Sequence, residues 1–164
     1  MAQRYYTVTW DQLHRDARAL AWRLIERLEK EGGGPFQGVV AITRGGLIPA
    51  AIVARELEIR VIESVSVVTY DEEKKGAPVV AKLPAAAGDG AGWLLIDDLV
   101  DTGTTAKVVR GLLPKAHFAT VYAKAAGKPL VDDFVTEVSQ DTWILFPWDT
   151  EPQFSPPLAR REQG

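Results

Sequence analysis

The chain alternates between segments whose apolar residues recur at helical spacing and shorter segments that are apolar almost throughout. Apolar residues three and four positions apart predict an amphipathic helix over residues 11–31, with Asp11 as its N-cap. An apolar segment after a glycine turn predicts a second helix over residues 47–58, with Pro49 in its first turn. A third helix is predicted over residues 106–113.

Runs of apolar and β-branched residues between these helices predict strands. The runs cover residues 37–43, 61–70, 93–96, 118–125, 134–138 and 142–146. The run 93–96 contains no polar side chain, which is typical of a strand that is covered on both faces. Because the strands alternate with helices, the pattern predicts an α/β fold with an open, mainly parallel sheet flanked by helices.

Residues 71–92 follow neither pattern. They are rich first in charged residues and then in Ala, Gly and Pro. A connection of this length in a compact domain is usually a functional loop, so we expect a mobile loop here, with a hairpin as the alternative. The chain has 164 residues and shows neither a repeat nor a second core, so residues 1–164 are predicted to form a single domain.

The composition narrows the possible functions. The chain has no Cys, which excludes a disulfide scaffold, a thiolate nucleophile and a cysteine-ligated metal. His14 and His117 are far apart, and neither has a second ligand at metal-binding spacing. A net charge of −3 argues against a general nucleic-acid binder but leaves room for a local phosphate site. Since the sequence shows neither a secretory signal nor an apolar run long enough to span a bilayer, a cytoplasmic protein is expected.

The strongest chemical signal lies directly after the run 93–96. Asp97 and Asp98 follow that buried strand, and Asp101 comes shortly after them. Small polar residues then lead into the third helix; they are Thr102, Gly103, Thr104 and Thr105. Ligands of open α/β sheets bind at the carboxyl ends of strands, and a helix N-terminus binds phosphate through its free N–H groups. Carboxylates beside a phosphate site fit a ligand that carries sugar hydroxyls and a divalent cation, for which Mg²⁺ is suited.

The segment from Asp97 to Thr105 resembles the phosphoribosyl-pyrophosphate (PRPP) motif of the type I phosphoribosyltransferase family. Further matching stretches extend the resemblance over nearly the whole chain, most specifically to bacterial members that act on xanthine and guanine; they include residues 44–47, 127–133, 140–144 and 147–149. The resemblance implies transfer of the 5-phosphoribosyl group from PRPP to N9 of a 6-oxopurine, with release of pyrophosphate, as in purine salvage. Xanthine and guanine are the implied bases, and hypoxanthine is left open. The implied fold adds a small base-binding hood and a mobile loop to the sheet.

The resemblance also implies roles for individual residues. The implied PRPP-binding residues are Arg44, Gly45, Asp97, Asp98, Asp101, Thr102, Gly103, Thr104 and Thr105, with a cis peptide before Arg44. Asp101 is the implied catalytic acid or base at N7 of the purine. The implied base-binding residues are Lys124 at the 6-oxygen, Trp143 stacked on the purine, and Ile144, whose backbone reads the group at C2. The implied Mg²⁺ contacts are Asp98 and Asp149.

The chain departs from the family pattern in several places, which include an insert at residues 32–35 and a longer loop after residue 71. Thr104 stands where close members have Gly, which is tolerable if its φ is negative. Lys74 or Lys75 would have to replace a PRPP-contacting arginine of the mobile loop, although a lysine does not reproduce a bidentate guanidinium. Leu145 and Phe146 replace polar residues beside the base pocket, so the preference among the three bases stays open.

Two other functions also stay open. A regulatory protein that keeps the PRPP pocket would need a basic nucleic-acid face or an added DNA-binding domain, and neither is visible. An enzyme with a pyrimidine acceptor is disfavoured by Lys124, Trp143 and Ile144. The resemblance further implies a homo-oligomer, either a tetramer or a dimer. It allows at most peripheral association with the inner membrane, for which no basic amphipathic helix is visible.

Overall fold

A six-stranded sheet forms the centre of the computed structural model, which describes residues 2–68 and 76–149. Its strand order is β4-β3-β2-β5-β6-β7, and neighbouring strands are parallel except for β4, which runs antiparallel to β3. These strands are β2 (Gly38–Thr43), β3 (Ile62–Val68), β4 (Val79–Lys82), β5 (Trp93–Val100), β6 (His117–Ala123) and β7 (Asp133–Glu137). The prediction of an open, mainly parallel sheet is confirmed.

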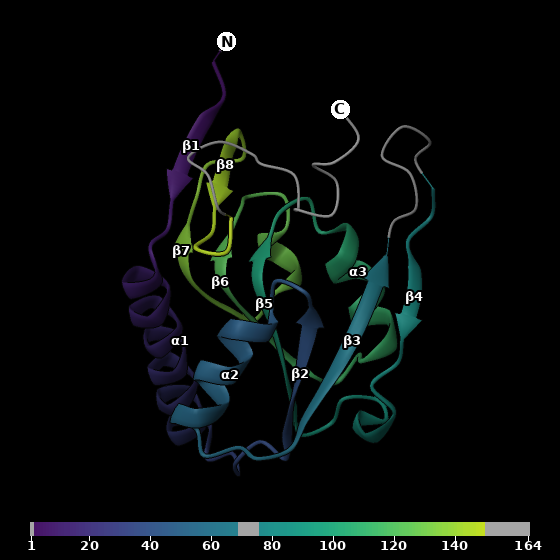
Figure 1. Cartoon of the computed structure of the whole chain (residues 1–164). Coiled ribbons are helices and arrows are strands. Elements are labelled where there is room, and N and C mark those ends of the chain that lie inside the picture. Colours follow the sequence, from purple (N-terminus) through teal and green to yellow (C-terminus); the bar gives the residue numbers. More distant parts are fainter. Residues whose placement is uncertain (1, 69–75, 150–164) are drawn as a thin grey trace.

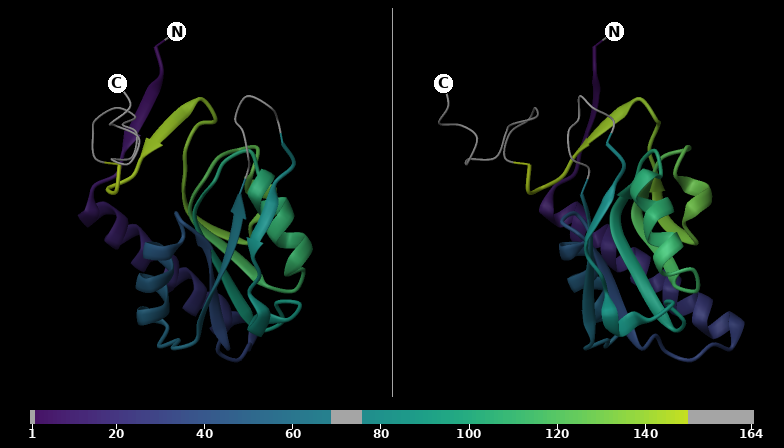
Figure 2. Two further views of the ribbon diagram at one scale, coloured as in Figure 1. Left: turned by 45° about the vertical axis from the view of Figure 1, so that its right-hand side comes forward. Right: turned by 90° about the vertical axis from the view of Figure 1, so that its right-hand side faces the viewer.

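Helices cover both faces of this sheet. In the described part of the chain they are α1 (Trp10–Glu31), α2 (Leu47–Glu56) and α3 (Thr104–Leu112), with short 3₁₀ turns η1 (Ala85–Ala87) and η2 (Lys128–Leu130). Helices α1 and α2 lie together on one face, whereas α3 lies on the other (Figure 1, Figure 2). Among residues 2–68 and 76–149, no helix combines the length and apolar character needed to cross a membrane.

The apolar residues of the central strands alternate between two cores. Val39 of β2 and Ile96 of β5 belong to the core under α1 and α2, whereas Val40 and Leu95 belong to the core under α3. All four side chains are fully buried. Successive residues of a strand face opposite sides, so a strand between two helical layers needs an unbroken apolar run. The prediction that residues 93–96 form a strand covered on both faces is confirmed.

A second, two-stranded sheet lies beyond the carboxyl ends of the central strands (Figure 1). It pairs β1 (Arg4–Thr7) in parallel with β8 (Thr142–Leu145). The sequence analysis missed β1, because its residues are mostly exposed and show no clear apolar alternation. This hood sheet, as we call β1 and β8 together, has the place that the resemblance implies for a base-binding hood.

The ends of several elements differ from the predictions. The N-cap of α1 is Thr9, whose Oγ1 accepts a hydrogen bond from the N–H of Gln12 at 3.2 Å, and the prediction of Asp11 was wrong. Asp11 lies instead in the first turn of α1, where its negative charge interacts favourably with the positive end of the helix dipole. Helix α2 ends two residues early, and Glu58 takes the positive φ of 55° that turns the chain away. Helix α3 begins two residues earlier than predicted, and β5 continues to Val100.

The segment 71–92, predicted as a mobile loop, contains a strand in its described part. Residues 79–82 form β4, which pairs with Ser66, Val67 and Val68 at the end of β3. The hairpin that the sequence left open as an alternative is therefore the arrangement found. Residues 71–75 lie outside the described residues, and so do the two candidate PRPP contacts Lys74 and Lys75.

Candidate active site

Within the described residues, pairing between strands β2 and β5 ends before β5 itself ends, which leaves the last part of β5 unpaired on that side. Pairing between the two strands stops at Ala41 opposite Ile96, whereas β5 continues alongside β6 to Val100. The last four residues of β5 therefore have no partner on the β2 side in the described structure. The turn that follows β2, residues 44–46, packs against this free edge.

Two glycines allow the turn to contact β5. A Cβ on Gly45 would overlap the carboxylate of Asp98, lying 2.5 Å from its Cγ and 2.7 Å from Oδ1. A Cβ on Gly46 would lie 2.5 Å from the carbonyl oxygen of Ile96. A Cβ at Gly46 would meet backbone atoms and a Cβ at Gly45 would displace the Asp98 carboxylate, so this close packing favours glycine at both positions. The Thr43–Arg44 peptide is cis, as the resemblance implies, and the structure brings Gly45 and Asp98 together.

The two adjacent carboxylates of β5 lie in a desolvated position. Burial, and next the charge of Asp98, raise the pKa of Asp97 well above its ordinary value. Burial likewise raises the pKa of Asp98. The N–H of Asp98 donates to Oδ1 of Asp97 at 2.9 Å. Groups that offset this negative charge, such as a cation or sugar hydroxyl donors, would be stabilised here.

A short loop leads from β5 into α3. Gly103 takes a φ of 89° and is the N-cap of α3, where no side chain caps the first turn. A Cβ at this position would also overlap Cδ1 of Leu130. Thr104 follows as the first residue of α3. Within the described residues, Glu58 is the one non-glycine with a positive φ, so the φ of Thr104 is negative. A side chain at position 104 is therefore tolerated, as the sequence analysis required. A pocket of about 130 Å³ is lined by Asp97 and the whole loop 101–105.

Asp101 is held on both of its oxygens. Lys124, which is buried just past the end of β6, donates from Nζ to Oδ2 at 3.0 Å. Gln140, from the turn between β7 and β8, donates from Nε2 to Oδ1 at 2.8 Å. The structure thus brings the predicted Asp101 and Lys124 into direct contact. The sequence analysis missed Gln140 as a site residue, although it begins one of the stretches on which the resemblance stands.

The two candidate base-binding residues of β8 face opposite ways. Trp143 is 49% exposed, whereas Ile144 is 5% exposed and belongs to the core under α1 and α2. The Trp143 indole is therefore half-exposed at the hood sheet, and the side chain of Ile144 packs into the core. Leu145 and Phe146, expected beside the base pocket, are both buried, and the Phe146 ring stacks on Trp148 at 4.8 Å.

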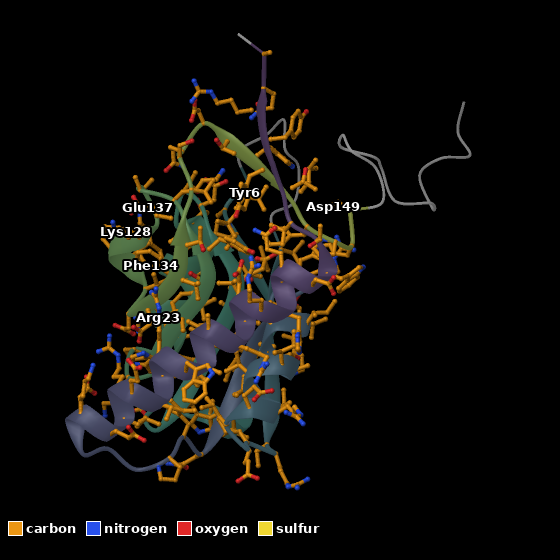
Figure 3. The ribbon with its side chains drawn as sticks, turned by 90° about the vertical axis from the view of Figure 1, so that its left-hand side faces the viewer. Tyr6, Arg23, Lys128, Phe134, Glu137 and Asp149 are labelled. Atoms are coloured by element: carbon orange, nitrogen blue, oxygen red, sulfur yellow. The ribbon has the colours of Figure 1, made fainter. Side chains whose placement is uncertain are left out.

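Asp149 lies just past the hood sheet. Its Oδ2 accepts a hydrogen bond from the N–H of Phe146 at 2.8 Å. Figure 3 shows Asp149 near the point where α1 begins, in agreement with the contact between the rings of Trp10 and Trp148. Burial is the main cause of the raised pKa of Asp98, and the negative charge of Asp149 raises it further. The two candidate metal contacts are therefore close enough to interact electrostatically. The described residues contain no group of three or more side chains that could hold a metal ion by themselves.

The chain is similar to known proteins over almost its whole length. A model of the phosphoribosyl transferase domain matches residues 9–155. A protein of Desulfotalea psychrophila named xanthine-guanine phosphoribosyltransferase is 62% identical over 162 residues, which cover 98% of this chain and 96% of that protein. A protein of the same name from Gluconobacter oxydans is 62% identical over 160 residues, covering 96% and 92%. The crystal structure of a purine phosphoribosyltransferase from Pyrococcus horikoshii superposes with a TM-score of 0.73 at 26% identity, covering 93% of this chain and 99% of that one. The chain belongs to the phosphoribosyl transferase domain family.

Proposed function

We propose that this protein is a purine salvage enzyme, which transfers the 5-phosphoribosyl group of PRPP to N9 of a 6-oxopurine and releases pyrophosphate. Xanthine and guanine are the proposed bases, because the two relatives at 62% identity are named xanthine-guanine phosphoribosyltransferases. The observation that carries the proposal is the meeting of three segments at one edge of the sheet. They are the turn 44–46, the carboxylates of β5 and the loop 101–105.

PRPP has three charged or polar parts, and each has a matching segment in this arrangement. The uncapped first turn of α3 offers backbone N–H groups to the 5-phosphate, and Thr102, Thr104 and Thr105 add hydroxyl donors. Thr102 and Thr104 are already within 3.1 Å of each other through their hydroxyl oxygens. The carboxylates of Asp97 and Asp98 suit the ribose hydroxyls, and the turn at Arg44 and Gly45 suits the pyrophosphate.

The residues present fit Mg²⁺. Asp98 and Asp149 would hold it, and because the described chain has no larger cluster of ligands, substrate oxygens and water would complete the coordination. This division between one or two carboxylates and a phosphate substrate is usual for Mg²⁺. When bound, the ion supplies positive charge that offsets the growing charge on the pyrophosphate.

The remaining steps belong to the side chains of this protein. As the C1–O bond of PRPP breaks, positive charge grows on the ribose, and the fixed charge of Arg44 stabilises the departing pyrophosphate. Trp143 stacks on the purine, the backbone of Ile144 reads the group at C2, and Lys124 turns its ammonium to the 6-oxygen. Asp101 exchanges a proton with N7 of the purine, a contribution of about 10²–10⁴-fold to the rate.

Release of pyrophosphate tests the proposal. The wild type and Asp101→Ala are incubated with PRPP, Mg²⁺ and each base in turn, including a pyrimidine. We expect turnover with a 6-oxopurine, a loss of about 10²–10⁴-fold in the variant, and loss of turnover when EDTA removes the cation. Tight PRPP binding without turnover on any base would refute salvage and favour a PRPP-sensing regulator, and turnover on a pyrimidine alone would refute the choice of base.

We further propose that the enzyme acts in the cytoplasm as a homo-oligomer, either a tetramer or a dimer. The lack of cysteine is compatible with a reducing compartment. Trp10 and Trp22 on α1 are 54% and 62% exposed, and aromatic side chains are enriched at protein interfaces. Light scattering on the purified protein tests the oligomer, and a monomer at all concentrations would refute it.

A further inference from the structure

The side chain of Gln140 uses both ends of its amide. Oε1 accepts a hydrogen bond from the backbone N–H of Ala126 at 3.0 Å, and Nε2 donates to Oδ1 of Asp101 at 2.8 Å. The oxygen and nitrogen of an amide side chain are told apart by their hydrogen-bond partners, and both partners are present here. A backbone N–H can only donate, so Oε1 faces Ala126 and the donor faces the carboxylate of Asp101.

Gln140 joins three segments that contribute to the proposed site. Asp101 begins the loop that enters α3, Ala126 lies two residues after Lys124, and Gln140 lies three residues before Trp143. The bridge therefore connects the proposed acid or base to the segments that carry the purine contacts. It links the connection between β7 and β8 to the segments that follow β5 and β6.

The second partner of Asp101 is one that the proposed reaction takes away. Lys124 donates to Oδ2 in this structure, but the same ammonium turns to the purine 6-oxygen in the proposed function. In the described part of the chain, Gln140 then provides the one side-chain hydrogen bond left on Asp101. The carboxylate side chain of Asp101 is 47% exposed, so packing does little to hold it in one rotamer.

We propose that Gln140 is a positioning residue: its amide keeps the Asp101 carboxylate aimed at the purine while Lys124 binds the 6-oxygen. The inference rests on the proposed function, since it needs Asp101 to exchange a proton with the base. A carboxylate displaced by about 1 Å can lose about 10²-fold in rate, so partial freedom at Asp101 has a cost of roughly tenfold in kcat.

The same placement predicts what Gln140 leaves unchanged. Apart from Asp101 itself, the proposed PRPP site consists of the turn 44–46 and residues 97–98 and 102–105, and Gln140 forms a hydrogen bond with none of these. Both hydrogen bonds of Gln140 are exposed, so water replaces them with little loss of stability. The KM for PRPP and the melting temperature therefore stay near the wild-type values when the bridge is removed.

Two variants separate the two ends of the amide. Gln140→Leu removes both hydrogen bonds at similar volume. Gln140→Glu keeps an oxygen for the N–H of Ala126 but places a second oxygen against the Asp101 carboxylate, where like charges repel. Gln3→Ala is the matched control, because Gln3 donates to the backbone oxygen of Asp141 and so supports the same turn without touching Asp101.

Steady-state kinetics with PRPP and a purine base, together with thermal melting, decide the inference. We expect kcat to fall roughly tenfold in Gln140→Leu and further in Gln140→Glu, with KM for PRPP and melting temperature unchanged and Gln3→Ala like wild type. A folded Gln140→Glu enzyme with wild-type kcat overturns the inference, and so does an equal loss of kcat in Gln3→Ala. If Gln140→Leu does not fold, Gln140→Glu decides alone. A wild type without turnover refutes the proposed function itself, which is a different result from an active wild type with unimpaired variants.

Discussion

A methyl group at position 45 should disable the site while leaving the fold intact. In Gly45→Ala the new Cβ would occupy the place of the Asp98 carboxylate, within 2.5 Å of its Cγ and 2.7 Å of Oδ1. The turn is fixed by its neighbour, because Gly46 lies against the backbone of Ile96 and donates its N–H to the oxygen of Ile42 at 2.8 Å. The carboxylate of Asp98 is therefore the group that must move.

The cost to stability is small, because a short side chain at a site edge can rotate away. Overpacking costs about 1–3 kcal/mol, and replacing Gly by Ala regains about 0.4–1 kcal/mol by restricting the unfolded chain. The net loss is then on the order of 1 kcal/mol, which lowers Tm by about 2–4 °C in a domain of this size. The cost to function is larger: displacing a positioned group by about 1 Å loses about 10²-fold in rate.

Pyrophosphate release at varied PRPP and Mg²⁺ measures the loss in kcat/KM, and thermal melting measures stability. Gly111→Ala is the matched control, because a Cβ at Gly111 in α3 meets nothing within 4 Å. Helix propensity predicts that this control gains about 0.5–1 kcal/mol and keeps full activity. Wild-type kcat/KM in Gly45→Ala would show that Asp98 is not held by the turn, or that its position does not matter to the reaction.

Two further predictions concern charged side chains. Lys124→Met keeps the buried stem of the side chain but removes the ammonium that donates to Asp101. We expect KM for the base to rise roughly 10–100-fold, because a charged hydrogen bond is lost, while KM for PRPP stays nearly unchanged. An equal rise in both constants would contradict the assignment of Lys124 to the base. Burial alone would raise the pKa of Asp133, but hydrogen bonds from His117 and Arg27 outweigh it and lower that pKa. This carboxylate therefore stabilises the fold above about pH 4 and stops doing so as the pH falls through its folded pKa. Asp133→Asn should melt below wild type near neutral pH, and a melting series should show the difference vanish in acid; a constant difference would contradict it.

The sequence predicted the layers of the fold well, because each central strand carries its pattern locally. The apolar run 93–96 indicates a strand covered on both faces, and the apolar residues of 47–56 indicate a helix packed on the sheet; the structure has both. Strands β1 and β4 were missed for a common reason: both are short, exposed edge strands, whose burial pattern is too weak to show a period of two. β1 pairs with β8, which lies far away along the chain, and β4 pairs with β3 across a long connection, so neither pairing can be seen locally.

Single site residues were predicted where chemistry follows a buried strand, as with Asp97, Asp98 and Asp101. The contacts between segments could not be predicted from the residues. The sequence marks Gly45 as a turn residue, but only the register of β2 on β5 shows that it lies against Asp98. Gln140 is harder still, because a glutamine in a turn has no pattern of its own and acquires its role from two partners on other loops.

The place of the site follows from the direction in which the chain crosses the sheet. After β2 the chain moves outward to β3 and β4, then returns to the other side of β2 and continues outward through β5, β6 and β7. Helix α2, which follows β2, lies on one face, and α3, which follows β5, lies on the other (Figure 2). The connections that leave β2 and β5 thus diverge, and in open α/β sheets ligands bind at the carboxyl ends of the strands where this happens. The turn 44–46 and the loop 101–105 are the first residues of those two connections. Any ligand held by both must therefore lie over the carboxyl end of β5, with Asp98 between its two anchoring loops.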